Sequence, residues 1–222
     1  MKPYIIRPVG FTDCRDFMIA NHYAKGMANT CIQAYGLYDG SLLIGAAAFN
    51  SGCSENARAD VFGPARKSAV AELHRLCILD VTPKNAESWF LARCFRRLKA
   101  DRPNLKAIKT FSDPTFGHVG TIYQASNARF YGQSNPETFY LDQDGRLRHR
   151  RQCGRNIGPD EARERGWTPK RVLGKFRYLF LLPESPRESR LLDSLCLLPK
   201  LTYPKHGVSA NGQLRLLEVA RG

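Results

Sequence analysis

The chain has 222 residues, with 34 lysines and arginines against 20 acidic residues and a formal net charge of +14. This length is enough to bury a real hydrophobic core. No stretch reaches the roughly 18 apolar residues of a membrane-spanning helix, and acidic residues interrupt the start where a signal peptide would be apolar. The seven cysteines include no CxxC pair, which excludes a zinc site of paired thiolates and predicts a reducing compartment.

The first 68 residues alternate between apolar stretches and polar turns. The pattern predicts, in chain order, a strand at Tyr4–Arg7, a helix that Thr12 caps and that ends near His22, strands at Cys31–Tyr38 and Ser41–Asn50, and a polar loop over residues 51–68. Asp39-Gly40 lies between the two longer strands and is the signal for a two-residue type I′ turn. We therefore expect a β-hairpin here.

The centre of the chain alternates strands with helices. We expect a strand at Glu72–Asp80, a helix from its cap Asn85 to about Lys99, a strand at Lys106–Phe111, a helix from about Val119 to Phe130, strands at Glu137–Leu141 and Arg146–Arg150, and a last strand at Lys175–Leu182. This order is typical of an α/β protein with a mixed central sheet flanked by helices. It resembles the GNAT acyltransferase fold, in which the cofactor lies between two central parallel strands.

A strongly basic segment interrupts this pattern. From Gly145 to Arg177 the chain holds eleven lysines and arginines and three acidic residues. Such an excess predicts a polyanionic partner, most often nucleic acid, although a solvated loop without a partner would have the same composition. We expect a catalytic domain over residues 1–182, with the basic insert at about 145–175, and a tail or extension over 183–222.

The stretch KTFSDPTFGHVGTIYQASNARFYG, residues 109–132, carries most of the polar candidates. Its Ser112 and Asp113 follow a predicted strand, and ligands collect at strand ends in α/β sheets. Together with residues 72–99, Asn21-His22-Tyr23 and the late LTYPK, this stretch resembles the phage Mom family of DNA adenine modification proteins. The resemblance extends from about residue 18 to residue 205.

The resemblance implies an enzyme related to GNAT acyltransferases that converts adenine in duplex DNA to an N6-carbamoylmethyl derivative. This change protects phage DNA from restriction in the cytoplasm of the bacterial host. The family's iron(II)-associated residues match His22, Tyr23, Asp113 and Tyr123, and their donor atoms suit iron better than calcium or magnesium. We expect these four side chains to converge, with Asp113 as metal ligand or proton acceptor. In the alternative, the His-Tyr pair packs its rings and Asp113 caps a turn.

The expected donor site departs from that of ordinary GNAT enzymes, because residues 81–88 contain no glycine. Lys84, Asn85 and Ser88 at the helix start could still meet a phosphate. The other candidates are Asn127 for cofactor binding, and Tyr131, with Ser112, for catalysis; Tyr131 could equally cover the core. The donor stays open between acetyl-CoA and glycyl-tRNA, since a glycyl group on N6 has the same atoms as a carbamoylmethyl group.

The adenine amine is paired in a duplex, so we expect the base to be flipped out for reaction. Double-stranded DNA would be held through its phosphates by arginines of the basic insert, namely Arg146, Arg148, Arg150, Arg151 and Arg155. Two other functions remain open. One is a GNAT N-acetyltransferase acting on a protein or small-molecule amine, and the other is a non-catalytic nucleic-acid-binding protein on the same scaffold.

Overall fold

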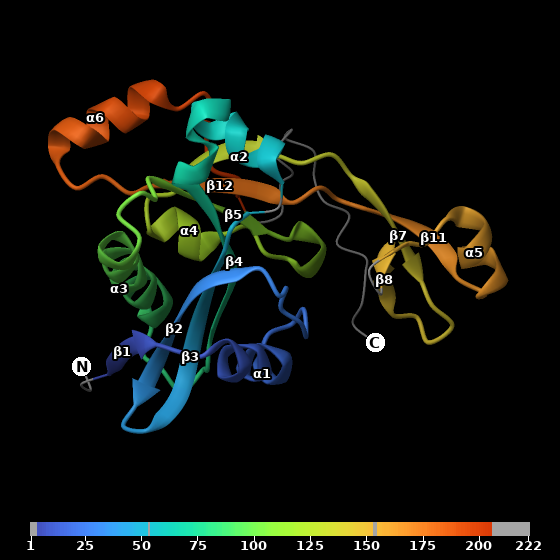
Figure 1. Ribbon diagram of the computed structural model, residues 1–222. Coiled ribbons are helices and arrows are strands. Elements are labelled where there is room, and N and C mark those ends of the chain that lie inside the picture. The colour runs from blue at the N-terminus through green and yellow to red at the C-terminus, as the bar shows by residue number, and fades with distance from the viewer. Residues whose placement is uncertain (1–3, 53, 153–154, 206–222) are drawn as a thin grey trace. The chain divides into compact units, whose positions relative to one another are not determined.

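The structure, a computed structural model, describes residues 4–52, 54–152 and 155–205 (Figure 1). The chain divides into two compact units. The first contains the residues up to Phe111 together with Gly120–Tyr131 and Arg177–Tyr203, and the second contains Ser112–Val119 and Gly132–Phe176. Within the described ranges, no helix combines the length and the apolar character that crossing a bilayer requires.

A seven-stranded sheet forms the centre of the first unit, with the order β1-β2-β3-β4-β5-β12-β6. Its strands are β1 (Ile5–Pro8), β2 (Cys31–Asp39), β3 (Leu42–Asn50), β4 (Val70–Ile78), β5 (Ala107–Ser112), β12 (Phe176–Leu181) and β6 (Arg129–Gln133). The strands from β1 to β4 are antiparallel neighbours, whereas β4 and β5 pair in parallel. The sheet is mixed and helices flank it, which confirms the expected α/β fold with a mixed central sheet (Figure 1).

Helices cover both faces of this sheet. They are α1 (Phe11–Asn21), α2 (Glu55–Phe62), α3 (Ala86–Asp101), α4 (Thr121–Ala125) and α6 (Pro186–Leu195), and a 3-10 turn, η1, spans Pro64–Ala69. Helix α1 packs against Ala46 and Ala48 of β3. The next residue, Phe49, meets Phe95 of α3 with ring centroids 6.1 Å apart. Because successive strand residues point to opposite faces, α1 and α3 lie on opposite sides of the sheet.

The polar loop predicted over residues 51–68 is wrong, because this segment contains α2 and η1. The hydroxyl of Ser54 accepts a hydrogen bond from the Ala57 N–H at 3.1 Å and so caps α2. Val61 and Phe62 in the last turn are buried in an apolar cluster that also includes residues of β4, β5 and α6. The sequence pattern hid the helix because its first turns are polar and only its end is apolar.

The helix predicted over residues 119–130 is much shorter than expected. Helix α4 ends at Ala125, and β6 begins at Arg129. Between them, Asn127 has a φ of 59°, the left-handed conformation that ends a helix and redirects the chain. Tyr131 therefore lies on a strand.

Two predicted helix caps differ from the observed ones. Helix α1 begins at Phe11 after Gly10, so Thr12 lies inside the helix and does not cap it. Asn85 does occupy the N-cap position of α3, but it has a φ of 68° and makes no capping hydrogen bond through its side chain.

The predicted hairpin forms, with a different turn. Asp39 pairs with Leu42, so Gly40 and Ser41 make the two-residue connection between β2 and β3. Gly40 has a φ of 60°, whereas Ser41 has no positive φ. A positive φ at the first turn position alone is typical of a type II′ turn and not of type I′.

The second unit is built on a three-stranded antiparallel sheet with the order β11-β7-β8. Its elements are η2 (Pro114–Phe116), β7 (Glu137–Leu141), β8 (Leu147–His149), β9 (Arg151–Gln152), β10 (Arg155–Asn156), α5 (Pro159–Glu164) and β11 (Thr168–Val172). Tyr140 of β7 is buried with Ala162 of α5 and with Ile157. This small core places α5 on one face of the three-stranded sheet.

Candidate active site

Strands β4 and β5 part near the centre of the sheet. Their parallel ladder ends at the pair Glu72↔Lys109, although both strands continue. Just beyond, the Thr110 hydroxyl donates to the Leu73 carbonyl at 3.2 Å, and it also shares a hydrogen bond with the phenol of Tyr123 on α4. Burial raises the pKa of the Tyr123 phenol, and the hydrogen bond with Thr110 acts in the opposite direction. The effect of burial is the larger one, so the phenol keeps its proton.

A β-bulge on β4 lies at the same point. On the neighbouring strand β3, Phe49 pairs with Leu73 and Ala48 pairs with Arg75, so that His74 is an extra residue in the ladder. A bulge of this kind bends the strand and re-aims the side chains beside it. The side chains of His74 and Arg75 therefore both become available to contact the loop that follows α1.

Arg75 and His74 bind that loop. The Nε of Arg75 donates to the Gly26 carbonyl at 2.9 Å, and its Nη1 donates to the His74 carbonyl at 2.8 Å. The Nε2 of His74 accepts a hydrogen bond from the Ala28 N–H at 3.2 Å. The neutral ring then carries its proton on Nδ1, which faces the Glu72 carboxylate at 3.5 Å. The loop is thus held where β4 and β5 part.

Two of the four predicted iron ligands, Tyr23 and Tyr123, lie near Arg75. Burial lowers the pKa of its guanidinium, while the neighbouring Tyr23, Glu72 and Tyr123 act in the opposite direction. The ring of His22 lies on that of Tyr23, with centroids 4.3 Å apart and an interplanar angle of 30°. This is the ring packing named above as the alternative to metal binding.

These side chains do not support an iron centre. The Nδ1 of His22 accepts a hydrogen bond from the Ala24 N–H at 3.0 Å, and Tyr123 retains its proton. Asp113 belongs to the second unit, where its carboxylate accepts from the Thr115 N–H at 2.9 Å and caps η2. Across residues 4–52, 54–152 and 155–205, no three His, Cys, Asp or Glu side chains form a group that could hold a metal. The approach of Asp113 to the other three stays a prediction.

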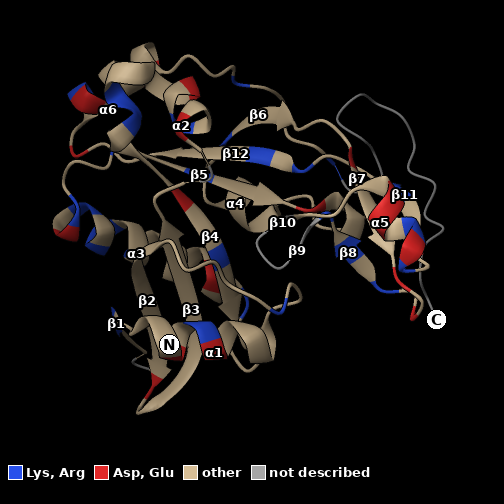
Figure 2. Cartoon of the chain, turned by 45° about the vertical axis from the view of Figure 1, so that its right-hand side comes forward, with Lys and Arg blue, Asp and Glu red and all other residues tan. Residues whose placement is uncertain are grey.

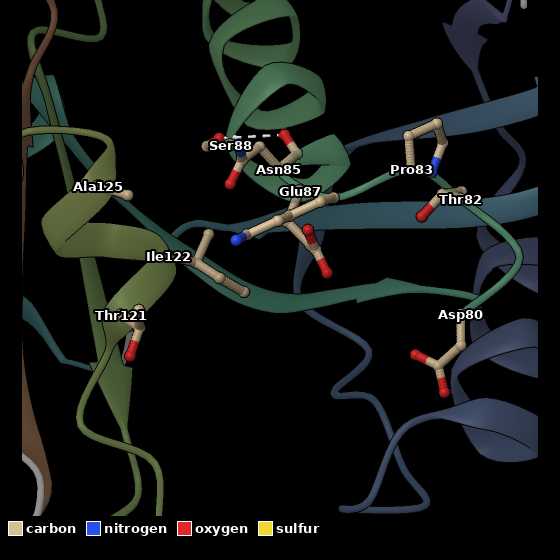
Figure 3. Close-up of a pocket in the computed structure, with 10 residues that line it drawn as sticks. Asp80, Thr82, Pro83, Asn85, Glu87, Ser88, Thr121, Ile122 and Ala125 are labelled. Carbon is tan, nitrogen blue, oxygen red and sulfur yellow. Dashed lines mark hydrogen bonds between the residues drawn. The ribbon is translucent and has the colours of Figure 1, made fainter.

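A cavity of about 300 Å³ lies at the start of α3. Figure 3 shows its walls, with the connection from β4 to α3 on one side and Thr121, Ile122 and Ala125 of α4 on the other. Two carboxylates, from Asp80 and Glu87, line it together with one lysine. The cavity is therefore a poor site for a phosphate group, despite the helix N-terminus.

A second cavity, of about 610 Å³, shares residues of the β4–α3 connection with the first. Lys84 and Arg93 line it, and its recorded lining contains no carboxylate. The guanidinium of Arg93 lies 3.8 Å from the ring centroid of Trp89, and Tyr4 meets the same indole edge-on at 6.4 Å. Cations beside aromatic rings fit a ligand that carries both a phosphate and a nucleobase.

Ser126 and Asn127, which follow α4, also line the second cavity. The hydroxyl of Ser126 is buried and has no hydrogen-bond partner among the described residues. The backbone N–H groups at the start of α3 lie beside the same space.

The four predicted cofactor residues all line these cavities. Lys84, Asn85 and Ser88 line both, and Asn127 lines the larger one. Ser88 donates its hydroxyl proton to the Asn85 carbonyl at 3.1 Å, drawn as the dashed line in Figure 3. Their contact with a cofactor stays a prediction.

The candidates Tyr131 and Ser112 lie elsewhere. Tyr131 is 2% exposed, packs in the apolar cluster beneath α2, and lines neither cavity. The cations of Lys109 and Arg177 lie 5.4 and 5.0 Å from its ring centroid. Ser112 ends β5 as a buried residue, and its hydroxyl has no partner within the described part of the chain.

The arginines predicted to hold DNA differ in their surroundings. The colours of Figure 2 show that the second unit contains acidic as well as basic residues. Arg148 donates through Nε to Asp142 at 2.6 Å, and the same carboxylate accepts the backbone N–H groups of Asp144 and Arg146. Arg148 therefore stabilises the turn between β7 and β8. Of the others, Arg146 pairs with Asp144 at 3.4 Å, Arg150 is exposed, and the side chains of Arg151 and Arg155 lie outside the described residues.

The sequence matches the model of the Mom protein family over residues 3–205, which is most of the chain. The chain belongs to the Mom protein family. The resemblance inferred from the motifs is thereby confirmed. The chain is 27% identical over 135 residues to methylcarbamoylase mom of Escherichia phage Mu. The match covers 61% of this chain and 55% of the phage protein, just over half of that relative's length.

Several solved structures with a similar chain arrangement are acetyltransferases. Spermidine N-acetyltransferase from Vibrio cholerae has 12% identity and a TM-score of 0.48, over 84% of this chain and 98% of its own. Ribosomal-protein-S18-alanine N-acetyltransferase from Escherichia coli has 8% identity and a TM-score of 0.47, over 82% and 96%. A putative acetyltransferase from Salmonella typhimurium, solved with its cofactor acetyl-CoA, has 13% identity and a TM-score of 0.47, over 82% and 96%.

Sequence reasoning missed three polar residues of this Mom-family site. Glu72, His74 and Arg75 lie in the strand sequence ELHRLC, which was interpreted as a strand without a chemical role. The available signal was the consecutive polar pair at 74 and 75. An even alternation would put one of these side chains in the core, so the pair indicates a bulge in the strand.

Proposed function

We propose that this Mom-family protein transfers an acyl-type group from a nucleotide-bearing donor to the N6 amine of adenine in DNA. The observation that carries the proposal is the family match over residues 3–205, together with the relative named methylcarbamoylase. The proposed product is N6-carbamoylmethyl adenine, which would protect phage DNA from a host nuclease.

The anionic part of the donor is assigned to the larger cavity. Lys84 and Arg93 supply positive charge there, and Trp89 supplies a stacking surface. An acyl-CoA carries phosphates and an adenine, and so does the aminoacylated end of a tRNA. The phosphates and adenine of either donor fit the cations and the aromatic ring of this cavity. The two donors differ in the acyl group that they carry.

The chemistry requires a group that accepts a proton. The N6 lone pair is delocalised into the purine, and the amine is paired in a duplex, so the base must leave the stack before it reacts. Attack of N6 on the carbonyl of a glycyl ester forms a C–N bond, breaks the ester C–O bond, releases the terminal hydroxyl of the tRNA and frees one N6 proton. The same attack on acetyl-CoA would break the C–S bond, release the thiol of CoA and give N6-acetyl adenine, which lacks the amide nitrogen of the carbamoylmethyl group. We assign acceptance of this proton to Asp113, through the carboxylate oxygen that does not cap Thr115. If the donor is glycyl-tRNA, an isomerisation of the N6-glycyl adduct then gives the carbamoylmethyl product without an oxidant.

Mass spectrometry of nucleosides from host DNA tests the proposal. Expression of the wild-type chain should produce an adenine adduct with the mass of a carbamoylmethyl group. Asp113→Asn should abolish the adduct, although asparagine can still cap the Thr115 N–H and preserve the turn. Asp144→Asn, which changes an exposed carboxylate paired with Arg146, is the matched control and should retain it.

An acetyl adduct, or no adduct from the wild-type chain, would overturn the proposal. Isotopic labels then separate the donors in a reconstituted reaction. Label from acetyl-CoA in the product excludes glycyl-tRNA, and label from glycyl-tRNA excludes acetyl-CoA.

A further inference from the structure

The three-stranded sheet of the second unit has one face opposite α5. Tyr140 of β7 is buried against Ala162 of α5, so its neighbour Phe139 points to the other face. The strand register places Phe139 between His149 of β8 and Lys170 of β11. A single row across the sheet therefore contains an imidazole, a phenyl ring and a cation.

The next row on this face is mainly apolar. Leu141 of β7 pairs with Leu147 of β8 and with Thr168 of β11. Thr168 is exposed, and Phe139, Leu141, Leu147, His149 and Lys170 are each half-buried. We call these last five residues the platform.

The aromatic centre of the platform is fixed in place. The rings of Phe139 and His149 meet edge to face, with centroids 4.8 Å apart and an interplanar angle of 78°. The Nε2 of His149 lies 3.1 Å from a carboxylate oxygen of Glu137. A ring held in this way loses little conformational freedom when a ligand packs on it.

The charge near the platform favours an anionic ligand. Several cations of the second unit are already neutralised, since Arg148, Arg163 and Arg165 each pair with a nearby carboxylate. Lys170 in the platform forms no ion pair within the described residues. Arg171, which pairs with Thr138, points to the opposite face of the sheet. A half-buried aromatic ring beside a cation that no carboxylate neutralises is suited to stacking a base and contacting a phosphate of single-stranded nucleic acid.

We propose that the platform binds an unpaired DNA strand, with one base stacked on Phe139 and an adjacent phosphate contacting Lys170. Paired bases in a duplex present only their edges in the grooves, so this surface discriminates against intact duplex. The unpaired nucleotides exposed when an adenine is flipped out are the segment it would hold. This inference rests on DNA being the substrate, and it is independent of the group that is transferred.

Binding of short fluorescent oligonucleotides to the full chain tests the inference. Stacking of one base is worth roughly 5- to 150-fold in affinity, so Phe139→Leu should weaken single-stranded DNA at least 5-fold and leave duplex affinity unchanged. Phe139→Tyr, which retains a ring, should bind like the wild type. Leu173→Ala is the matched control, because it removes an exposed apolar side chain of the same unit outside the paired strands. Lys170→Ala should flatten the dependence of log affinity on log salt for single strands by about 0.7.

A base analogue gives a second readout that does not depend on a variant. 2-Aminopurine in the single strand should be quenched by the wild-type chain, and an abasic nucleotide at that position should weaken binding to the wild type but not to Phe139→Leu. The inference is overturned if the wild type and Phe139→Leu bind single strands with equal affinity. It is also overturned if Phe139→Leu loses as much affinity for duplex DNA as for single strands. If Phe139→Leu does not fold, the abasic comparison is made with the wild type and Phe139→Ala. An abasic effect that is present in the wild type and lost in Phe139→Ala supports the inference, and no abasic effect in the wild type overturns it.

The two proposals fail in different ways. Suppose that the protein forms an adenine adduct in host DNA but that its affinity for single strands does not depend on Phe139. The inference about the platform is then wrong, and the proposed function stands. Single-strand binding that depends on Phe139, in a protein that forms no adduct, would mean the reverse.

Discussion

Replacing Arg75 should detach the loop after α1 from β4. In the structure the guanidinium donates to the carbonyls of Gly26 and His74, at 2.9 and 2.8 Å, and lies among Tyr23 and Glu72. Hydrogen bonds from a charged donor contribute about 1.5–3 kcal/mol each, and Arg75 makes two of them. Arg75→Ala should therefore lower the free energy of unfolding by about 3–5 kcal/mol. This is a large part of the roughly 5–15 kcal/mol that a typical domain has.

The lysine variant separates charge from geometry. Arg75→Lys retains the positive charge beside Glu72 but cannot reach two carbonyls with a planar fork, so we expect a loss of about 1.5–3 kcal/mol. Urea unfolding at neutral pH measures these free energies. Hydrogen exchange at the Ala28 amide, which donates to His74, reports the loop itself and should accelerate in both variants. Arg66→Ala is the control, because Arg66 is exposed and its loss should change stability by less than about 0.5 kcal/mol.

The reasoning has a clear refutation. If Arg75→Lys unfolds at the wild-type urea concentration and the Ala28 amide keeps its protection, the two carbonyl contacts do not hold the loop. The closeness of Tyr23 to Arg75 would then need another cause, and the site around β4 would have to be described without this arginine.

Two further predictions concern pH and salt. Burial raises the pKa of the Cys14 thiol from 9.0 to about 12. Between these two pH values the folded chain holds a proton that the unfolded chain has released. The protonated thiol therefore contributes fully to the free energy of unfolding below pH 9, and this contribution falls between pH 9 and 12. Cys14→Ala should therefore make the fall in unfolding free energy across that range less steep, and an unchanged slope would contradict the assignment. Arg148→Ala should lower the melting temperature and leave the salt dependence of DNA binding unchanged, whereas Arg150→Ala should leave the melting temperature unchanged and flatten that dependence by about 0.9 on duplex DNA. The opposite pattern would make Arg148 the phosphate contact.

Periodicity located the elements whose side chains alternate regularly, and it failed where tertiary contacts decide the structure. Strand β4, helix α3 and strand β5 were predicted to within about two residues, because each buries one continuous apolar face. Helix α2 was missed because the burial of Val61 and Phe62 depends on distant strands. The helix predicted up to Phe130 failed because Asn127 adopts a left-handed conformation that no apolar pattern records.

The candidate site was predictable to the same limited extent. Lys84, Asn85 and Ser88 follow from their place at a helix start after a strand, and the structure does place them around cavities. The function of Arg75 could not be inferred, because it depends on a bulge that shifts one residue out of register. Tyr131 was misplaced for a simpler reason, since its predicted helix is a strand and its ring is buried.

A charge count along the chain does not show which cations of the basic insert are paired with carboxylates. The counted segment begins at Gly145, which excludes the acidic residues Glu137, Asp142 and Asp144 of the preceding strand and turn. The antiparallel pairing of β7 with β8 returns the chain on itself, so these carboxylates meet His149, Arg148 and Arg146 across the hairpin. A net charge counted over consecutive residues therefore overestimates the positive charge that a polyanion would meet, if the counted segment includes only one strand of a hairpin. The cations available to a polyanion are then those without an ion pair. Lys170, which faces Phe139, forms no ion pair within the described residues, whereas Arg148 pairs with Asp142.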